Sequence, residues 1–150
     1  MPATNSVRIM EDGPRNVILL IEGNNGSTGN PGTGGLDLAS TSLITPAQVG
    51  YVNLATLQRC AAFRVDCIEW DVQAESTMRV DLAWAATADQ VFYSCIGRAN
   101  KFFKPMGGLY APAGLAGATG GIDISTTGAP VTQAAWTITL FLVKNGLNPA

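Results

Sequence analysis

The sequence predicts an all-β protein, a single antiparallel β-sandwich that is jelly-roll-like, with a glycine-rich loop or arm after an early strand. Three observations lead to this prediction. Several segments alternate apolar and polar side chains with the period of a strand, turn residues separate these segments, and no segment carries a convincing 3.6-residue apolar repeat. Strands joined by loops rather than by crossover helices favour antiparallel packing. The 150 residues fit one domain over 1–150.

Seven strands are expected along the chain. The sequences between them, such as GP, NPG, APAG and TTGAP, are typical of turns. A short turn or helix is expected near 46–49 or 54–60. The expected strands cover residues 7–11, 15–22, 62–73, 77–85, 90–96, 121–126 and 134–144.

Two of these strands supply most of the expected core. Residues 77–85 alternate strictly and place Trp84 on a buried face. Residues 134–144 place Trp136 on one apolar face, while Phe141 belongs to a second face that is also partly apolar. We therefore expect both faces of this last strand to be covered, and both tryptophans to lie in the core.

Residues 62–73 form an expected strand that carries an acidic cluster. The apolar alternation changes phase after Cys67, as it does at a β-bulge. Asp66, Glu69 and Asp71 could suggest the paired carboxylates of a glycosidase. Strand spacing places Glu69 and Asp71 on the same face, however, so we interpret the cluster as a solvated strand face.

The composition bears on the kind of partner. Apolar residues make up 47% of the chain and charged residues only 13%, about half the usual charged share. Such a chain either exposes little surface or covers much of it with partners, as an assembly subunit does. The net charge of −2 attracts neither nucleic acid nor an anionic membrane. No apolar run could span a bilayer, and the first residues lack a signal peptide, so we expect synthesis in the cytoplasm.

The residue types exclude several kinds of catalysis. The chain has no histidine, which rules out Ser-His-Asp triads, Cys-His dyads and histidine-bound zinc. Cys60, Cys67 and Cys95 cannot all pair within one chain, and their spacing fits no zinc site, so reduced buried thiols are expected. We expect no enzyme activity, no metal and no cofactor.

A glycine-rich stretch, EGNNGSTGNPGTGGLD, occupies residues 22–37. It matches neither GxGxxG nor GxxxxGK[ST] and holds no lysine, so it does not predict a phosphate site. Two interpretations remain: a surface loop, or an extended arm that orders against a neighbouring subunit. As an arm, it would contact a partner protein or a sister chain through Asn24, Asn25, Gly26, Thr28, Asn30 and Gly32.

The sequence RANKFFKP, residues 98–105, places basic residues around two phenylalanines. Proteins that bind single-stranded nucleic acid use this pattern. A strand end that carries core phenylalanines and interface lysines is commoner. We therefore expect no nucleic-acid partner and assign Lys101 and Lys104 to protein contacts.

A strand beginning GPRN opens the chain. A strand with an LxWxATxD core, a GGL stretch, a GxTGDI turn and a last strand ending in lysine follow. In this order, these motifs resemble a small structural protein of tailed bacteriophage virions. Two residues are inserted in the fourth motif, and the resemblance covers about two thirds of the chain. The matching residues are Leu82, Trp84, Ala86, Thr87 and Asp89; Gly107, Gly108 and Leu109; and Gly117, Thr119, Gly120, Asp123 and Ile124.

The resemblance implies a head decoration or cement protein on the outer capsid surface. Its partner would be the major capsid protein. The low charge and the two-faced apolar pattern of the last strand predict a homo-oligomer, and a trimer is the first choice because capsids have three-fold positions. A tail, collar or fibre-attachment protein is the alternative. A glycan-binding sandwich would need exposed aromatics, whereas Trp70, Trp84 and Trp136 all fall on apolar-patterned faces.

Overall fold

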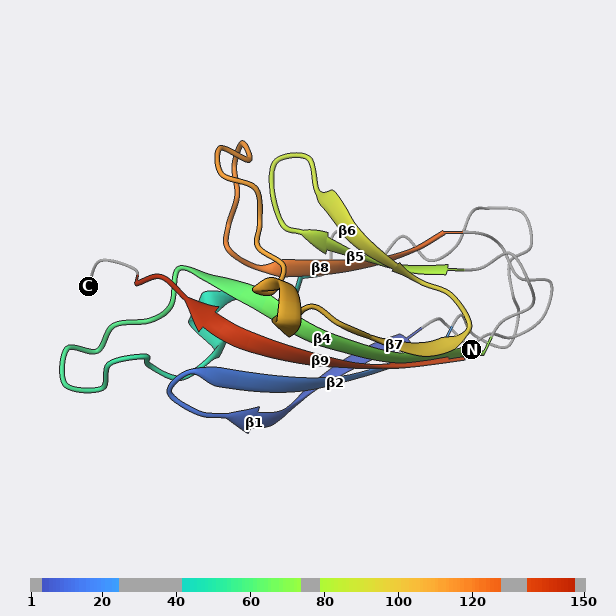
Figure 1. Cartoon of the computed structure of the whole chain (residues 1–150), viewed down its shortest axis with the longest axis horizontal. Coiled ribbons are helices and arrows are strands. Elements are labelled where there is room, and N and C mark those ends of the chain that lie inside the picture. Colours follow the sequence, from blue (N-terminus) through green and yellow to red (C-terminus); the bar gives the residue numbers. More distant parts are fainter. Residues whose placement is uncertain (1–3, 25–41, 74–78, 128–134, 148–150) are drawn as a thin grey trace.

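The computed structural model describes residues 4–24, 42–73, 79–127 and 135–147. Within these residues the chain forms nine strands and two short 3-10 helices (Figure 1). No helix there is long and apolar enough to cross a membrane. The strands are β1 (Thr4–Asp12), β2 (Asn16–Asn24), β3 (Ser42–Ile44), β4 (Ala62–Gln73), β5 (Arg79–Trp84), β6 (Gln90–Cys95), β7 (Arg98–Phe102), β8 (Ile122–Thr127) and β9 (Ala135–Asn145), and the 3-10 helices are η1 (Pro46–Gln48) and η2 (Lys104–Met106).

The strands form two antiparallel sheets that pack face to face (Figure 1). Sheet A has the order β1-β2-β9-β4-β7, and sheet B has the order β3-β8-β5-β6. Apart from the β5-β6 hairpin, successive strands from β2 onward alternate between the two sheets. This interleaving is the jelly-roll arrangement of two Greek keys, which confirms the predicted fold class.

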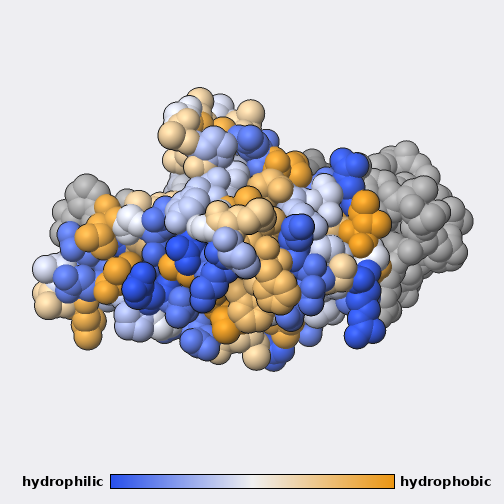
Figure 2. All heavy atoms as spheres, viewed as in Figure 1, coloured by the Kyte–Doolittle hydropathy of each residue, from blue (hydrophilic) through white to orange (hydrophobic). Residues whose placement is uncertain are grey.

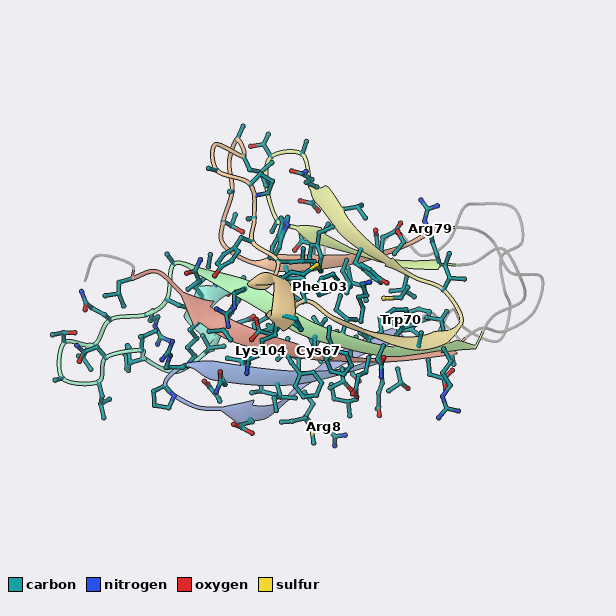
Figure 3. The ribbon with its side chains drawn as sticks, viewed as in Figure 1. Arg8, Cys67, Trp70, Arg79, Phe103 and Lys104 are labelled. Atoms are coloured by element: carbon teal, nitrogen blue, oxygen red, sulfur yellow. The ribbon has the colours of Figure 1, made fainter. Side chains whose placement is uncertain are left out.

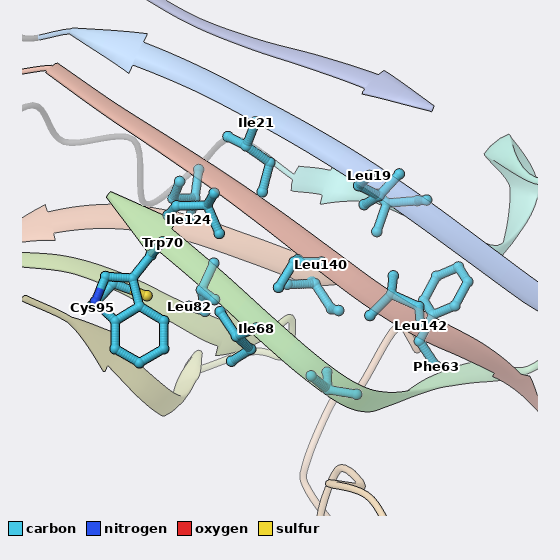
Figure 4. Packing of buried hydrophobic residues seen from close by; sticks show 14 of the residues in the cluster. Leu19, Ile21, Phe63, Ile68, Trp70, Leu82, Cys95, Ile124, Leu140 and Leu142 are labelled. Atoms are coloured by element: carbon cyan, nitrogen blue, oxygen red, sulfur yellow. The ribbon is translucent and has the colours of Figure 1, made fainter. Parts of the chain in front are cut away.

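The core lies between the sheets and takes the inward side chains of both (Figure 4). In β9 the burial alternates strictly, so Trp136 and Leu140 are buried while Thr137 is exposed and Phe141 is half-buried. The prediction that Trp84 and Trp136 are core residues is confirmed. No second layer of the described chain packs on the outer face of sheet A, so the expected covering of that face of β9 stays a prediction.

The predicted bulge in β4 is present, but one residue earlier than expected. Val65 pairs with Leu142 and Cys67 pairs with Phe141, so the register shifts at Asp66. Cys67 therefore shares the outer face with Phe141 rather than the core face with Val65. Because cysteine is apolar, Cys67 continued the apolar alternation in the sequence, and the bulge was therefore expected one residue too late.

All seven expected strands are found, with ends that agree within three residues. The structure adds β3 and β7. All five residues of β7 are exposed, so no buried face gave it an alternating pattern. The expected turn at 46–49 is η1, whereas 54–60 begins with a hairpin tip instead of a helix, closed by the pairing of Asn53 with Gln58.

A buried ion pair joins the last strand to the first. Lys144 Nζ lies 2.7 Å from Asp12 Oδ1 and donates to Gly50 O at 2.9 Å, while the Gly50 N–H donates to Asp12 Oδ2. Burial raises the pKa of Asp12, but the hydrogen bonds from Lys144 and Gly50 outweigh it and hold that pKa below its ordinary value. The carboxylate therefore stabilises the fold while it is ionised.

Candidate protein-docking surface

The outer face of sheet A carries an apolar band that crosses four strands. Ile18 of β2 is opposite Phe141 of β9, which is opposite Cys67 of β4, which in turn is opposite Phe102 of β7. Phe102 is 57% exposed, and Ile18 and Phe141 are half-buried. We call these four residues the apolar band. Side chains opposite one another on a sheet lie about 4.5–5.5 Å apart at Cβ, so the band is continuous.

A hollow of about 340 Å³ lies over the apolar band. Burial raises the pKa of the Cys67 thiol at its centre, and the nearby Glu69 carboxylate adds to this effect. Three carboxylates and one lysine stand around the apolar side chains. The lining residues are Glu11, Asn16, Val17, Ile18, Asp66, Cys67, Glu69, Phe102, Lys104, Phe141, Leu142 and Val143.

Polar side chains cover the neighbouring half of the same face. Glu69 is opposite Asn100, and Asp71 is opposite Arg98, an arrangement that sets opposite charges side by side. The predicted solvated strand face is confirmed, because Glu69 is exposed and Asp71 is half-buried. A broad depression of about 700 Å³ runs over these residues and over the outward threonines of β9. The outer face is thus apolar at one end and polar at the other.

The segment after β7 places the two predicted lysines differently. Lys104, in η2, is exposed and lines the hollow, whereas Lys101 pairs with Ile68 and starts from the other face of the edge strand. In Figure 3, Lys104 and Cys67 lie together at sheet A, while Phe103 lies between the sheets. The pattern predicted two core phenylalanines, but only Phe103 is buried.

Backbone and side-chain contacts hold the segment after β7 against the bulge of β4. The Phe103 N–H donates to Asp66 O at 2.7 Å, at the β4 bulge. The Asp66 carboxylate accepts two hydrogen bonds from Arg64, at 2.6 and 2.9 Å. These bonds raise the pKa of Arg64 and hold the carboxylate at the rim of the hollow. The hollow therefore has a preset shape.

The glycine-rich candidates fall mostly outside the described residues. Asn24 ends β2, where its backbone pairs with Thr4 and Ala135. The others, Asn25, Gly26, Thr28, Asn30 and Gly32, lie in the segment that the structure does not describe. The arm hypothesis remains a prediction.

Other acidic and thiol groups serve the fold. Asp81 is buried on β5, where it accepts from Ser94 at 2.6 Å and pairs with Arg79. Within the described ranges no group of three or more Cys, Asp or Glu is placed to hold a metal ion. The three cysteines are all described; each is buried and none forms a disulfide, as expected. Burial, with Asp81 nearby, raises the pKa of Cys95 to about 12.

Sequence reasoning identified Lys104 but missed the apolar band. A signal was available, because Ile18, Phe141 and Val143 are apolar residues at outward positions of their strands. We interpreted the apolar outward face of the last strand as covered, but we did not connect it with the outward apolar residues of the neighbouring strands. Comparisons with protein-family models, with curated proteins and with solved structures found no match for this chain.

Proposed function

We propose that this protein is a structural component of a tailed-phage virion, a decoration protein that binds the outer head surface and stabilises contacts between capsomers. The observation that carries the proposal is the uncovered apolar band on the outer face of sheet A. The major capsid protein is the partner, and the protein acts as a homo-oligomer.

The composition of the outer face supports docking to protein. The centres of protein interfaces are apolar and rich in aromatic side chains, and their rims are polar. The apolar band has this composition, with Glu11, Glu69 and Lys104 at its margin. Apolar side chains gain stability when a partner removes them from water. Covering the band therefore favours a complex with a partner protein.

The choice of a virion rests on two weaker supports. The jelly-roll fold occurs in viral capsid proteins, but also in lectins and cupins, so by itself it assigns no role. The ordered motifs from GPRN to the closing lysine resemble phage structural proteins, so they favour a viral protein over a lectin or a cupin. A tail, collar or fibre-attachment protein would share all of these features.

A saccharide is the second candidate ligand, and one observation favours it. The exposed ring of Phe102 stands beside the polar depression that Glu69, Asp71, Arg98 and Asn100 line. Aromatic faces next to hydrogen-bonding side chains suit sugar rings. Binding to a glycan array that Phe102→Ser abolishes would support this alternative.

Immunogold labelling of intact virions tests the proposed function. Antibodies against the purified protein would be applied to particles of the phage whose genome encodes this chain. We expect gold over the whole head at regular density. Gold confined to the tail or neck would support the alternative location, and unlabelled particles would overturn the proposal.

A further inference from the structure

A second apolar surface projects beyond the end of the sheets at which Asp12 and Lys144 lie, since Gly50 at its base is hydrogen-bonded to both. Residues 50–59, here called the finger, extend beyond the sheets and appear in blue-green at the left of Figure 1. At its tip Leu54 is 75% exposed and Leu57 is 58% exposed. Hydrophobic spheres mark this projecting end in Figure 2. Because Leu54 and Leu57 are exposed at the tip, they bury little apolar surface against their own chain.

The finger is held in one conformation. The Asn53 side chain accepts the N–H groups of Ala55 and Thr56 at 3.1 and 3.3 Å, and Gln58 pairs with Asn53 through the backbone. Leu57 has φ +54, which is uncommon for a residue with a side chain. A preset tip loses little conformational entropy on binding.

The finger and the hollow complement each other in shape and polarity. The finger is convex and apolar at its tip, whereas the hollow is concave and floored by the apolar band. Its volume of about 340 Å³ is at the lower end of the roughly 300–1,000 Å³ that is usual for pockets that bury small molecules. That space suits one or two leucine side chains.

Charge also favours this pairing. The hollow is lined by Glu11, Asp66 and Glu69 and by Lys104. Because Asp66 is paired with Arg64, the lining is weakly acidic through Glu11 and Glu69. The finger contains Arg59 and no acidic residue. The Arg59 guanidinium lies 4.4 Å from the centre of the Tyr51 ring, at the base of the finger. Opposite charges steer the two surfaces together and fix their orientation.

We propose that the finger of one copy docks into the hollow of a second copy of this chain. This inference rests on the proposed function: it assigns the hollow at the apolar end of the outer face to a sister chain and leaves the polar end of that face to the capsid protein. The finger and the hollow are different surfaces, so the contact is either exchanged reciprocally in a two-fold dimer or joins copies head to tail. Head-to-tail contacts close into a ring when the rotations complete a turn, and the expected trimer is one such ring.

Sedimentation velocity with complementary variants tests this contact. Leu54→Glu with Leu57→Glu disables the finger, and Phe102→Glu disables the hollow. The control is Val91→Glu, a change at a half-exposed residue of β6 outside both surfaces. We expect the wild type and the control to form a closed oligomer. Each variant should be monomeric, with self-association at least about tenfold weaker.

Mixing the two variants gives the decisive result. A finger variant still has an intact hollow, and a hollow variant has an intact finger, so an equimolar mixture should form heterodimers and nothing larger. A wild type that stays monomeric at micromolar concentrations, unchanged assembly of either variant, or a mixture that stays monomeric would overturn the contact. Phe102→Ser replaces Phe102→Glu if the latter lowers the melting temperature. Gold on virion heads together with a failed mixture would remove this contact and leave the proposed function standing.

Discussion

At the scale of single residues, the ion pair between Lys144 and Asp12 couples the edge strand β1 of sheet A to its central strand β9. The Lys144 side chain is 1% exposed and that of Asp12 is 26% exposed. A buried ammonium that loses its carboxylate is strongly disfavoured. We expect Asp12→Asn to lower the free energy of unfolding by about 1–3 kcal/mol at neutral pH, measured by urea denaturation. Glu11→Gln, the neighbouring exposed carboxylate, is the control and should change it little.

The same pair predicts a pH dependence. The folded-state pKa of Asp12 lies below its ordinary value of 3.8, so folding favours the ionised form. The stabilisation is therefore fully present above pH 3.8 and is lost as the pH falls through the folded-state pKa. The difference in unfolding free energy between wild type and Asp12→Asn should shrink at such acidic pH. A difference that stays constant into this range would refute the role assigned to the carboxylate.

Trp84 shows what sequence reasoning does well at this scale. Strict alternation over 77–85 placed it in the core, and it is 4% exposed and stacks on Phe92 with ring centres 4.3 Å apart. Trp84→Ala should cost about 3–5 kcal/mol of stability, as large-to-small core changes do. Thermal and chemical denaturation measure this loss. A loss under about 1 kcal/mol would mean that the indole is not a core residue.

At the scale of elements, prediction succeeded where one face is buried and failed where none is. The alternation of β9 matches its burial because one face packs against the core, whereas in β5 every residue after Arg79 is buried. The β7 strand lies at the edge of sheet A with every residue exposed, so its pattern carried no signal. The β3 strand has three residues, too few for a period of two to be recognised. The β4 bulge was found but displaced, because Cys67 suits either face.

The position of Cys67 after this bulge predicts its reactivity. It lies on the outer face and is 6% exposed, whereas Cys60 and Cys95 are fully buried. Burial raises the pKa of all three thiols, so each should react more slowly than a free thiol. In the native protein, we expect an alkylating reagent to modify Cys67 first, as read by peptide mass spectrometry. Prior labelling of Cys60 or Cys95 would contradict the outward placement of Cys67.

At the scale of the whole molecule, the jelly roll was predictable and the docking surface only in part. Turn spacing and alternation define a β-sandwich, because burial repeats along each strand. The apolar band joins Ile18, Cys67, Phe102 and Phe141, which lie on four strands far apart in the sequence. Only the strand order brings them together, so no local pattern could reveal the band. Lys104 was identified because basic residues beside aromatics are visible within one short segment.

Occupancy of virions by outer-face variants tests the central claim most directly. Wild type, Phe102→Glu and the Val91→Glu control would be added to particles of the proposed virion that lack this protein, and the bound protein would be quantified after sedimentation. We predict that wild type and control fill the particles, while Phe102→Glu binds at least about tenfold less, since a lost contact between copies also reduces multivalent attachment. Equal binding by all three proteins, or no binding by the wild type, would contradict the account.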